Sequence, residues 1–196
     1  MTIPNYISIL RILLVPVFIA LILYYVNHEV ELYRHLAITV FVLAIVSDAV
    51  DGYLARRMNQ TTRLGAILDP LADKLLLVGG IVVLSIDYRP ILPTIPIWLT
   101  TLIVTRDTIL PLGTILISYT GSTPKVVPRM TGKLATVAQM TMILWALAKA
   151  PEAGLAILIW VAGLLTLLSG VRYILDGVAQ LDSCPEPPPT PPPPTD

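Results

Sequence analysis

The sequence predicts an all-α integral membrane protein with six transmembrane helices and a polar, metal-binding cavity on the cytoplasmic side. Of its 196 residues, 55% are hydrophobic and only 13% are charged, and the mean hydropathy is +0.78. This composition is too apolar for an ordinary soluble domain. Two further observations support the prediction: apolar stretches long enough to cross a bilayer recur along the chain, and four aspartates interrupt them between positions 48 and 73.

Six apolar stretches of roughly the length of a membrane span follow one another, and we expect one helix in each. Prolines and glycines separate several of them, as is typical of helix ends. The first stretch contains Arg11 and no small-residue cleavage site follows it, so we expect a retained span rather than a secretory signal. The predicted spans cover residues 7–26, 36–57, 65–86, 95–119, 132–148 and 153–174.

The basic residues predict the orientation of these spans. With the N-terminus inside, the outer loops contain only Arg34, Arg89 and Lys149 of the 13 lysines and arginines. Cytoplasmic loops carry an excess of basic residues in membrane proteins. We therefore expect both termini on the cytoplasmic side, which is the bacterial cytoplasm or the mitochondrial matrix if the membrane is an inner membrane of either kind.

Composition divides the chain into two parts and excludes some functions. Residues 1–182 form the predicted six-helix transmembrane domain, whereas 183–196 are so rich in proline that we expect a disordered cytoplasmic tail. Equal numbers of basic and acidic residues give no support for binding nucleic acid. The single cysteine, Cys184, has no second thiol for a disulfide or a CxxC metal motif.

The four aspartates are the strongest functional signal. Asp48 and Asp51 are three residues apart and Asp69 and Asp73 are four apart, so each pair lies on one face of its helix. In the predicted topology, the first pair lies late in an inward-running span and the second early in the outward-running one. A short connection would bring all four carboxylates to the same cytoplasmic depth.

Intramembrane carboxylates are costly unless they are paired, bind metal or face a polar cavity. Four hard oxygen donors without a nearby histidine or thiol suit Mg²⁺ or Mn²⁺ better than zinc or copper. Two such ions could hold a pyrophosphate and stabilise both oxygens of an in-line displacement. The residues leave two alternatives open: structural ion pairs with Arg56, Lys74 or Arg106, and a cation or proton transport pathway.

The pattern D-x-x-D-G-x-x-A-R, eight residues, then G-x-x-x-D-x-x-x-D resembles the signature of the CDP-alcohol phosphatidyltransferase family. The resemblance covers residues 1–176 and implies a membrane enzyme that transfers a phosphatidyl group from a CDP-linked lipid such as CDP-diacylglycerol to an alcohol, releasing CMP. It also suggests a homodimer. All signature positions are occupied, by Asp48, Asp51, Gly52, Ala55, Arg56, Gly65, Asp69 and Asp73.

The resemblance implies a role for each signature residue. The four aspartates would coordinate two divalent cations, Mg²⁺ or Mn²⁺, and Asp73 would also remove the proton from the acceptor hydroxyl. Asp48, Gly52, Ala55 and Gly65 would border the CDP-lipid. Arg56 would contact its phosphate, or else serve as a positively charged anchor of the cytoplasmic loop.

Three other cations are candidates for binding the acceptor: Arg106, Lys133 and Arg172. A phosphate-bearing acceptor needs such a basic pocket. The structural alternatives are an ion pair of Arg106 with Asp107 or Asp73, and snorkelling of Lys133 and Arg172 to the membrane surface.

The acceptor itself is expected to be glycerol-based. The opening T-I-P-N-Y-I-S-I-L-R resembles both the branch that forms phosphatidylglycerophosphate and the CMP-forming cardiolipin synthases. The stretches around Arg106-Asp107, with Pro111 soon after, look closer to cardiolipin synthases. The expected acceptor is therefore phosphatidylglycerol, giving cardiolipin, with glycerol 3-phosphate as the alternative.

Overall fold

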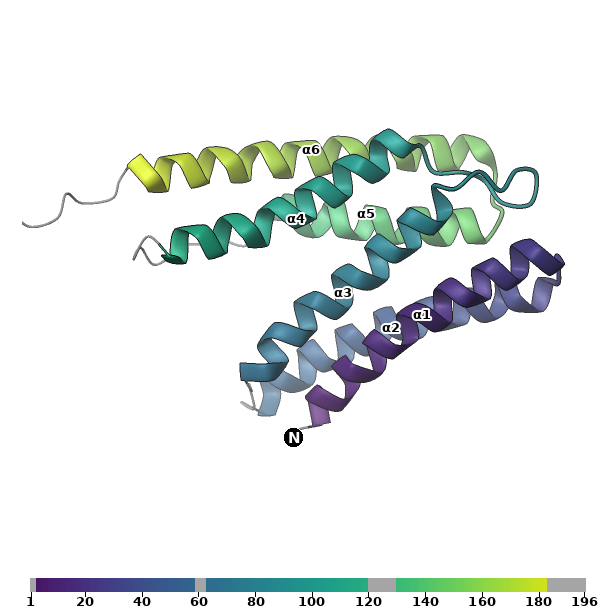
Figure 1. Cartoon of the computed structure of the whole chain (residues 1–196), viewed down its shortest axis with the longest axis horizontal. Helices are drawn as coiled ribbons and strands as arrows, with labels where there is room; N and C mark the ends of the chain where they lie inside the picture. The colour runs from purple at the N-terminus through teal and green to yellow at the C-terminus, as the bar shows by residue number, and fades with distance from the viewer. Residues whose placement is uncertain (1–2, 59–62, 120–129, 183–196) are drawn as a thin grey trace, which may run out of the picture.

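The computed structural model describes residues 3–58, 63–119 and 130–182, with side chains for 9–48, 72, 74–110, 112 and 130–175. Six α-helices account for the secondary structure of this part of the chain, so the all-α prediction is confirmed there (Figure 1). The helices are α1 (Ile3–His28), α2 (Glu31–Met58), α3 (Arg63–Leu84), α4 (Ile97–Tyr119), α5 (Met130–Leu147) and α6 (Glu152–Asp182).

Each predicted span overlaps with one helix, and prolines mark the start of two of the helices. Pro96 directly precedes α4 and Pro151 directly precedes α6. Their carbonyl oxygens accept the first bonds of these helices, from the amides of Leu99 and Gly154, each at 3.0 Å. Among the described residues, Ile9–His28 and Glu152–Leu175 have the length and apolar composition of a membrane span.

Helices α1, α2 and α3 pack together as one group, and small residues bring them close. A Cβ on Gly79 would lie 3.2 Å from Ile19, and a Cβ on Gly80 would lie 3.2 Å from Phe18. The Phe18 ring in turn lies 5.1 Å from the ring of Phe41. The two glycines therefore let α3 approach α1 more closely than larger residues would allow.

Helices α4, α5 and α6 form the second group, and polar contacts join them within the apolar surroundings. In the buried part of this group, Gln139 Nε2 donates to Thr166 Oγ1 at 3.0 Å, which connects α5 to α6. The Tyr173 hydroxyl donates to the carbonyl of Leu110 at 2.8 Å, which connects α6 to α4. These bonds satisfy polar groups that would be costly to bury alone.

The two groups meet at the end opposite the N-terminus and diverge toward the end where α2 stops and α3 starts (Figure 1). At the meeting end, Arg34 of α2 donates to the carbonyl of Leu147 in α5 at 3.0 Å. The ammonium of Lys149 lies 5.1 Å from the centre of the Tyr25 ring. Charge and cation–π contacts thus tie α1 and α2 to the end of α5.

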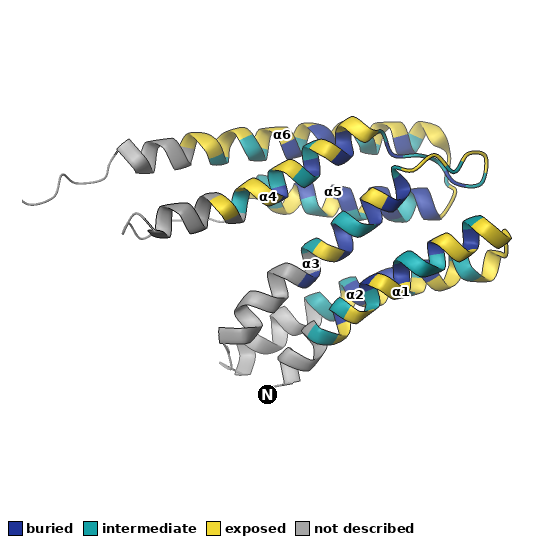
Figure 2. Ribbon diagram, viewed as in Figure 1, coloured by how far each residue is buried: buried dark blue, intermediate teal, exposed yellow. Residues whose placement is uncertain are grey.

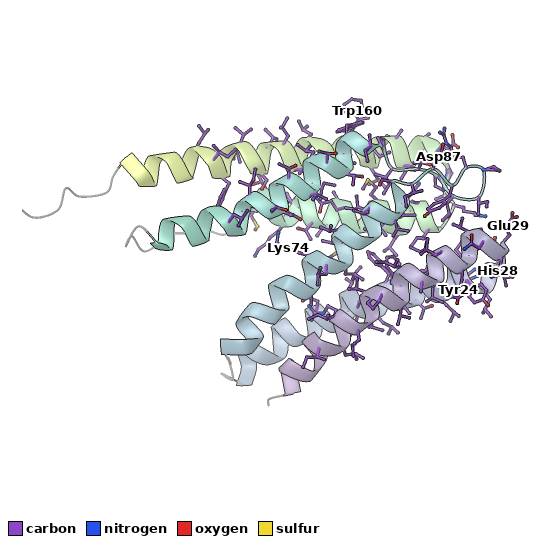
Figure 3. The ribbon with its side chains drawn as sticks, in the orientation of Figure 1. Tyr24, His28, Glu29, Lys74, Asp87 and Trp160 are labelled. Carbon is purple, nitrogen blue, oxygen red and sulfur yellow. The ribbon has the colours of Figure 1, made fainter. Side chains whose placement is uncertain are left out.

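The connection between α3 and α4 lies at the same end, where Figure 3 labels Asp87. Arg89 donates to both carboxylate oxygens of Asp87, at 2.8 and 2.9 Å. The side-chain hydrogen bond from Arg89 is the main reason that the pKa of Asp87 lies far below its ordinary value. This exposed pair orders the connection.

Exposed residues lie on the outward faces of the helices, and buried residues lie where helices face one another (Figure 2). Many of the exposed residues are large and apolar. Large exposed side chains include Leu13 at 60%, Ile157 at 64% and Trp160 at 72% exposure. A soluble monomer rarely exposes so continuous an apolar surface. Such a surface is what a lipid environment stabilises.

Candidate active site

The aspartates lie on two helices whose ends are neighbours. Asp48 and Asp51 belong to the last three turns of α2, and Asp69 and Asp73 to the first three turns of α3. Figure 1 shows these ends side by side, at the end where the two helix groups diverge. The backbone therefore has the antiparallel arrangement that the predicted convergence of the carboxylates requires.

Of the signature side chains, the structure describes only that of Asp48. The other seven have helical backbone, and their side chains lie outside the described residues. Within the described side chains, no group of three or more histidines, cysteines, aspartates or glutamates is placed to hold a metal ion. The metal role of Asp48 thus stays a prediction. So do the metal and CDP-lipid roles of the other seven, Asp51, Gly52, Ala55, Arg56, Gly65, Asp69 and Asp73.

Asp48 forms an ion pair that sequence reasoning missed. Arg11 of α1 donates from a guanidinium nitrogen to Oδ1 of Asp48. The arginine side chain is only 1% exposed, whereas that of the aspartate is 43% exposed. The available signal was Arg11 itself, because a single arginine inside an apolar span needs an anion or a polar cavity.

A second polar cluster joins α3 to α4. Lys74 Nζ lies 3.3 Å from Oδ1 of Asp107 and 3.4 Å from its carbonyl oxygen, and Figure 3 labels this lysine between the two helices. Arg106 also contacts Oδ1 of Asp107, at 3.2 Å. The predicted structural pair of Arg106 with Asp107 is confirmed, while the side chain of its alternative partner, Asp73, lies outside the described residues.

Arg106 reaches the other two helices of its group. Its Nη2 donates to the hydroxyl of Ser169 in α6 at 2.9 Å, and a Cβ on Gly132 in α5 would lie 3.2 Å from the same nitrogen. Glycine at position 132 therefore makes room for the guanidinium. The side chain is only 9% exposed, and its buried Nε has no hydrogen-bond partner among the described residues.

The other two predicted acceptor residues lie next to these contacts in the sequence. Lys133 follows Gly132, and Arg172 lies one helical turn after Ser169. Both side chains are exposed, so the structure places them around the Arg106 guanidinium by backbone position but shows no contact with it.

A pocket of about 140 Å³ lies between α4 and α6, and it is distinct from the aspartate region. Apart from Arg106 its lining is almost entirely apolar, with Leu102, Ile109 and Val171 among the contributing residues. None of the four signature aspartates lines it. The pocket therefore borders Arg106 on an apolar side and is not a candidate reaction centre.

Comparisons with known proteins cover the part of the chain that contains the signature. A family model described as CDP-alcohol phosphatidyltransferase matches residues 1–168, which include every signature position. A relative from Haemophilus influenzae is named CDP-diacylglycerol–glycerol-3-phosphate 3-phosphatidyltransferase; it is 33% identical over 175 residues, which cover 88% of this chain and 91% of that protein.

The proteins of the same name from Escherichia coli K12 and from Shigella flexneri serotype 5b are each 33% identical over 183 residues, covering 91% of this chain and 96% of the relative. The alternative of a transport protein is therefore wrong, because the matched family is one of transferases. The chain is an enzyme of phospholipid synthesis that belongs to the CDP-alcohol phosphatidyltransferase family.

Proposed function

We propose that the enzyme transfers the phosphatidyl group of CDP-diacylglycerol to glycerol 3-phosphate, giving phosphatidylglycerophosphate and CMP. The observation that carries the reaction class is the complete eight-residue signature on α2 and α3. The acceptor follows from the relatives, whose printed name specifies glycerol 3-phosphate. This reverses the order expected from the sequence, in which phosphatidylglycerol came first on the basis of short stretches around Arg106 and Pro111.

The donor set of the aspartates fits two divalent cations. Asp48, Asp51, Asp69 and Asp73 supply only carboxylate oxygens, which are the ligands that Mg²⁺ and Mn²⁺ prefer. A metal ligand must be accessible to the ion, and the Asp48 side chain meets this requirement because it is 43% exposed despite its ion pair. When bound, the ions would supply positive charge beside the pyrophosphate of the CDP-lipid and its leaving oxygen.

The remaining chemistry is assigned to side chains of the chain itself. Asp73 accepts the proton of the acceptor hydroxyl, whose oxygen forms a bond to the phosphorus of the phosphatidyl group. The bond from that phosphorus to the bridging oxygen breaks, and CMP leaves with the electron pair. A carboxylate near cations is a weak base, and close positioning against the hydroxyl compensates for this.

The substrates are assigned to opposite sides of this centre. Gly52, Ala55 and Gly65 have little or no side chain, so they suit close approach of the cytidine and pyrophosphate, with Arg56 contacting phosphate. Arg106, Lys133 and Arg172 would bind the acceptor phosphate. The support for this assignment is the placement of Arg106 among α4, α5 and α6.

We further propose that all six helices span the membrane with both termini in the cytoplasm, so that the active site faces the cytoplasm. The basic residues support this orientation, and the bacterial relatives favour a bacterial inner membrane over a mitochondrial one. Residues 1–182 would be the catalytic domain, and 183–196, outside the described residues, a cytoplasmic tail. A homodimer remains a proposal from the family resemblance.

The experiment that tests this function measures CMP release by the purified protein with CDP-diacylglycerol and Mg²⁺ or Mn²⁺. Glycerol 3-phosphate and phosphatidylglycerol are supplied in separate reactions, and the lipid product is identified by mass. We expect CMP and phosphatidylglycerophosphate with glycerol 3-phosphate alone. Release only with phosphatidylglycerol would establish a cardiolipin synthase instead, and release with neither would refute both acceptors.

A further inference from the structure

Among the side chains that the structure describes, the cluster between α3 and α4 contains more positive than negative charge. Lys74 and Arg106 both contact the same oxygen, Oδ1 of Asp107, at 3.3 and 3.2 Å. In the part of the chain whose side chains are described, neither cation pairs with a second carboxylate. Two formal positive charges therefore share one negative charge.

Burial makes this imbalance significant. Arg106 and Asp107 are each 9% exposed, and they lie within an apolar helix bundle where an uncompensated charge is costly. The buried Arg106 Nε, which has no hydrogen-bond partner in the part of the chain with described side chains, adds an unsatisfied donor there. The cluster at Asp107 therefore has both the charge and the donor capacity to bind a further anion.

Lys74 is the member of the cluster that a ligand could reach most easily. Its side chain is 36% exposed, whereas Asp107 is nearly buried. An ammonium has three donors, and the described contacts of Lys74 are both with Asp107, at its carboxylate and its carbonyl oxygen. The ammonium can thus stay in place against Asp107 and still donate to a phosphate.

The position of Lys74 in the sequence relates the cluster to the chemistry. It directly follows Asp73, the proposed base, so the two Cα atoms lie about 3.8 Å apart. Both residues thus belong to one turn of α3, and their separation is comparable to the length of a small acceptor that carries a phosphate at one end and a hydroxyl at the other. Glycerol 3-phosphate has this chemistry.

We infer that Lys74 contacts the acceptor phosphate together with Arg106, and that Asp107 is the positioning residue that holds the two cations side by side. This inference rests on the proposed function and adds two residues to the proposed acceptor site. It assigns the excess charge of the cluster to substrate binding rather than to helix packing.

The first test compares Lys74→Met and Lys74→Arg with the wild type. We expect Lys74→Met to raise the KM for glycerol 3-phosphate at least tenfold, the scale of a lost charge-assisted hydrogen bond. The KM for CDP-diacylglycerol should change less than about twofold, and Lys74→Arg should recover most of the loss. Lys149→Met is the matched control, since it removes a lysine from the opposite end of the molecule.

The second test addresses Asp107. Asp107→Asn should raise the KM for glycerol 3-phosphate several-fold, and Asp107→Glu, which keeps the charge, should recover part of it. Asp87→Asn, which removes an arginine-bound carboxylate from the exposed connection, serves as the control. A further measurement covers the case in which Lys74→Met does not fold: inorganic phosphate should inhibit the wild type competitively against glycerol 3-phosphate, and Lys74→Arg should keep most of this inhibition.

The outcomes separate this inference from the proposed function. If the wild type releases no CMP with glycerol 3-phosphate, both are wrong. If the wild type is active but Lys74→Met has an unchanged KM for glycerol 3-phosphate, only the inference is wrong. Losses confined to kcat or to thermal stability, with both KM values unchanged, would likewise assign the cluster to structure alone.

Discussion

The ion pair of Arg11 with Asp48 leads to a prediction about both stability and activity. Breaking a buried pair by removing one partner costs about 3–5 kcal/mol when both charges are buried. Here the arginine is 1% exposed but the aspartate is 43% exposed, so water can stabilise the carboxylate that remains. We therefore expect Arg11→Met to lower the free energy of unfolding by roughly half that amount, about 2 kcal/mol.

The double variant Arg11→Met/Asp48→Asn separates the two effects. It removes both charges of this pair, so it should regain much of the stability that Arg11→Met loses. The double variant should nevertheless be inactive in CMP release, because the amide at position 48 replaces a proposed metal ligand. The assays are thermal unfolding in detergent and CMP release at saturating CDP-diacylglycerol.

The control for this pair is Arg34→Met, which removes an arginine that contacts Glu31 and the Leu147 carbonyl at the other end of the molecule, far from Asp48. Its loss should be similar in the presence and absence of Asp48→Asn. Equal unfolding midpoints for Arg11→Met and the wild type, or strictly additive effects of the two substitutions at 11 and 48, would refute the reasoning.

Three further predictions concern the proposed chemistry and the outer connection. Asp73→Asn should abolish CMP release while the protein still binds CDP-diacylglycerol, and wild-type turnover in that variant would remove Asp73 as the base. Chelation by EDTA should stop turnover, with recovery on adding Mg²⁺ or Mn²⁺; activity that persists after exhaustive chelation would contradict the metal role of the aspartates. Because Arg89 lowers the pKa of Asp87 from its usual 3.8, this pair should stabilise the fold above that pH and lose its contribution as the pH falls further. Thermal unfolding of Asp87→Asn against the wild type should therefore differ at neutral pH and converge in acid.

Much of the fold was predictable because it depends on local properties of the chain. Length and hydropathy place six helices, and the prolines before α4 and α6 set their starts. The ends were less accurate: α1 begins at Ile3 because Pro4 is tolerated in a first helical turn. Helix α6 continues to Asp182 rather than 174, since the sequence contains no proline until Pro185.

The contacts between helices were predicted less well. Asp107 was foreseen as a partner of Arg106 because the two are adjacent in sequence. The pairing of Arg11 with Asp48 and of Lys74 with Asp107 depends on how α1 and α2, and α3 and α4, are rotated about their axes. A sequence gives the face on which a residue lies, but packing decides which neighbour that face meets.

The continuity of α2 has a consequence for how the chain can vary. This helix runs without interruption from Glu31 to the region of Asp48 and Asp51. At its first end, the Glu31 carboxylate accepts a hydrogen bond from the Lys149 ammonium at 3.4 Å. Adding one residue between these ends would turn everything beyond it by about 100° and advance it by about 1.5 Å. Asp48 would then face away from Arg11, and Asp51 would turn with it. Length changes should therefore be tolerated in the connections between helices but not along this helix.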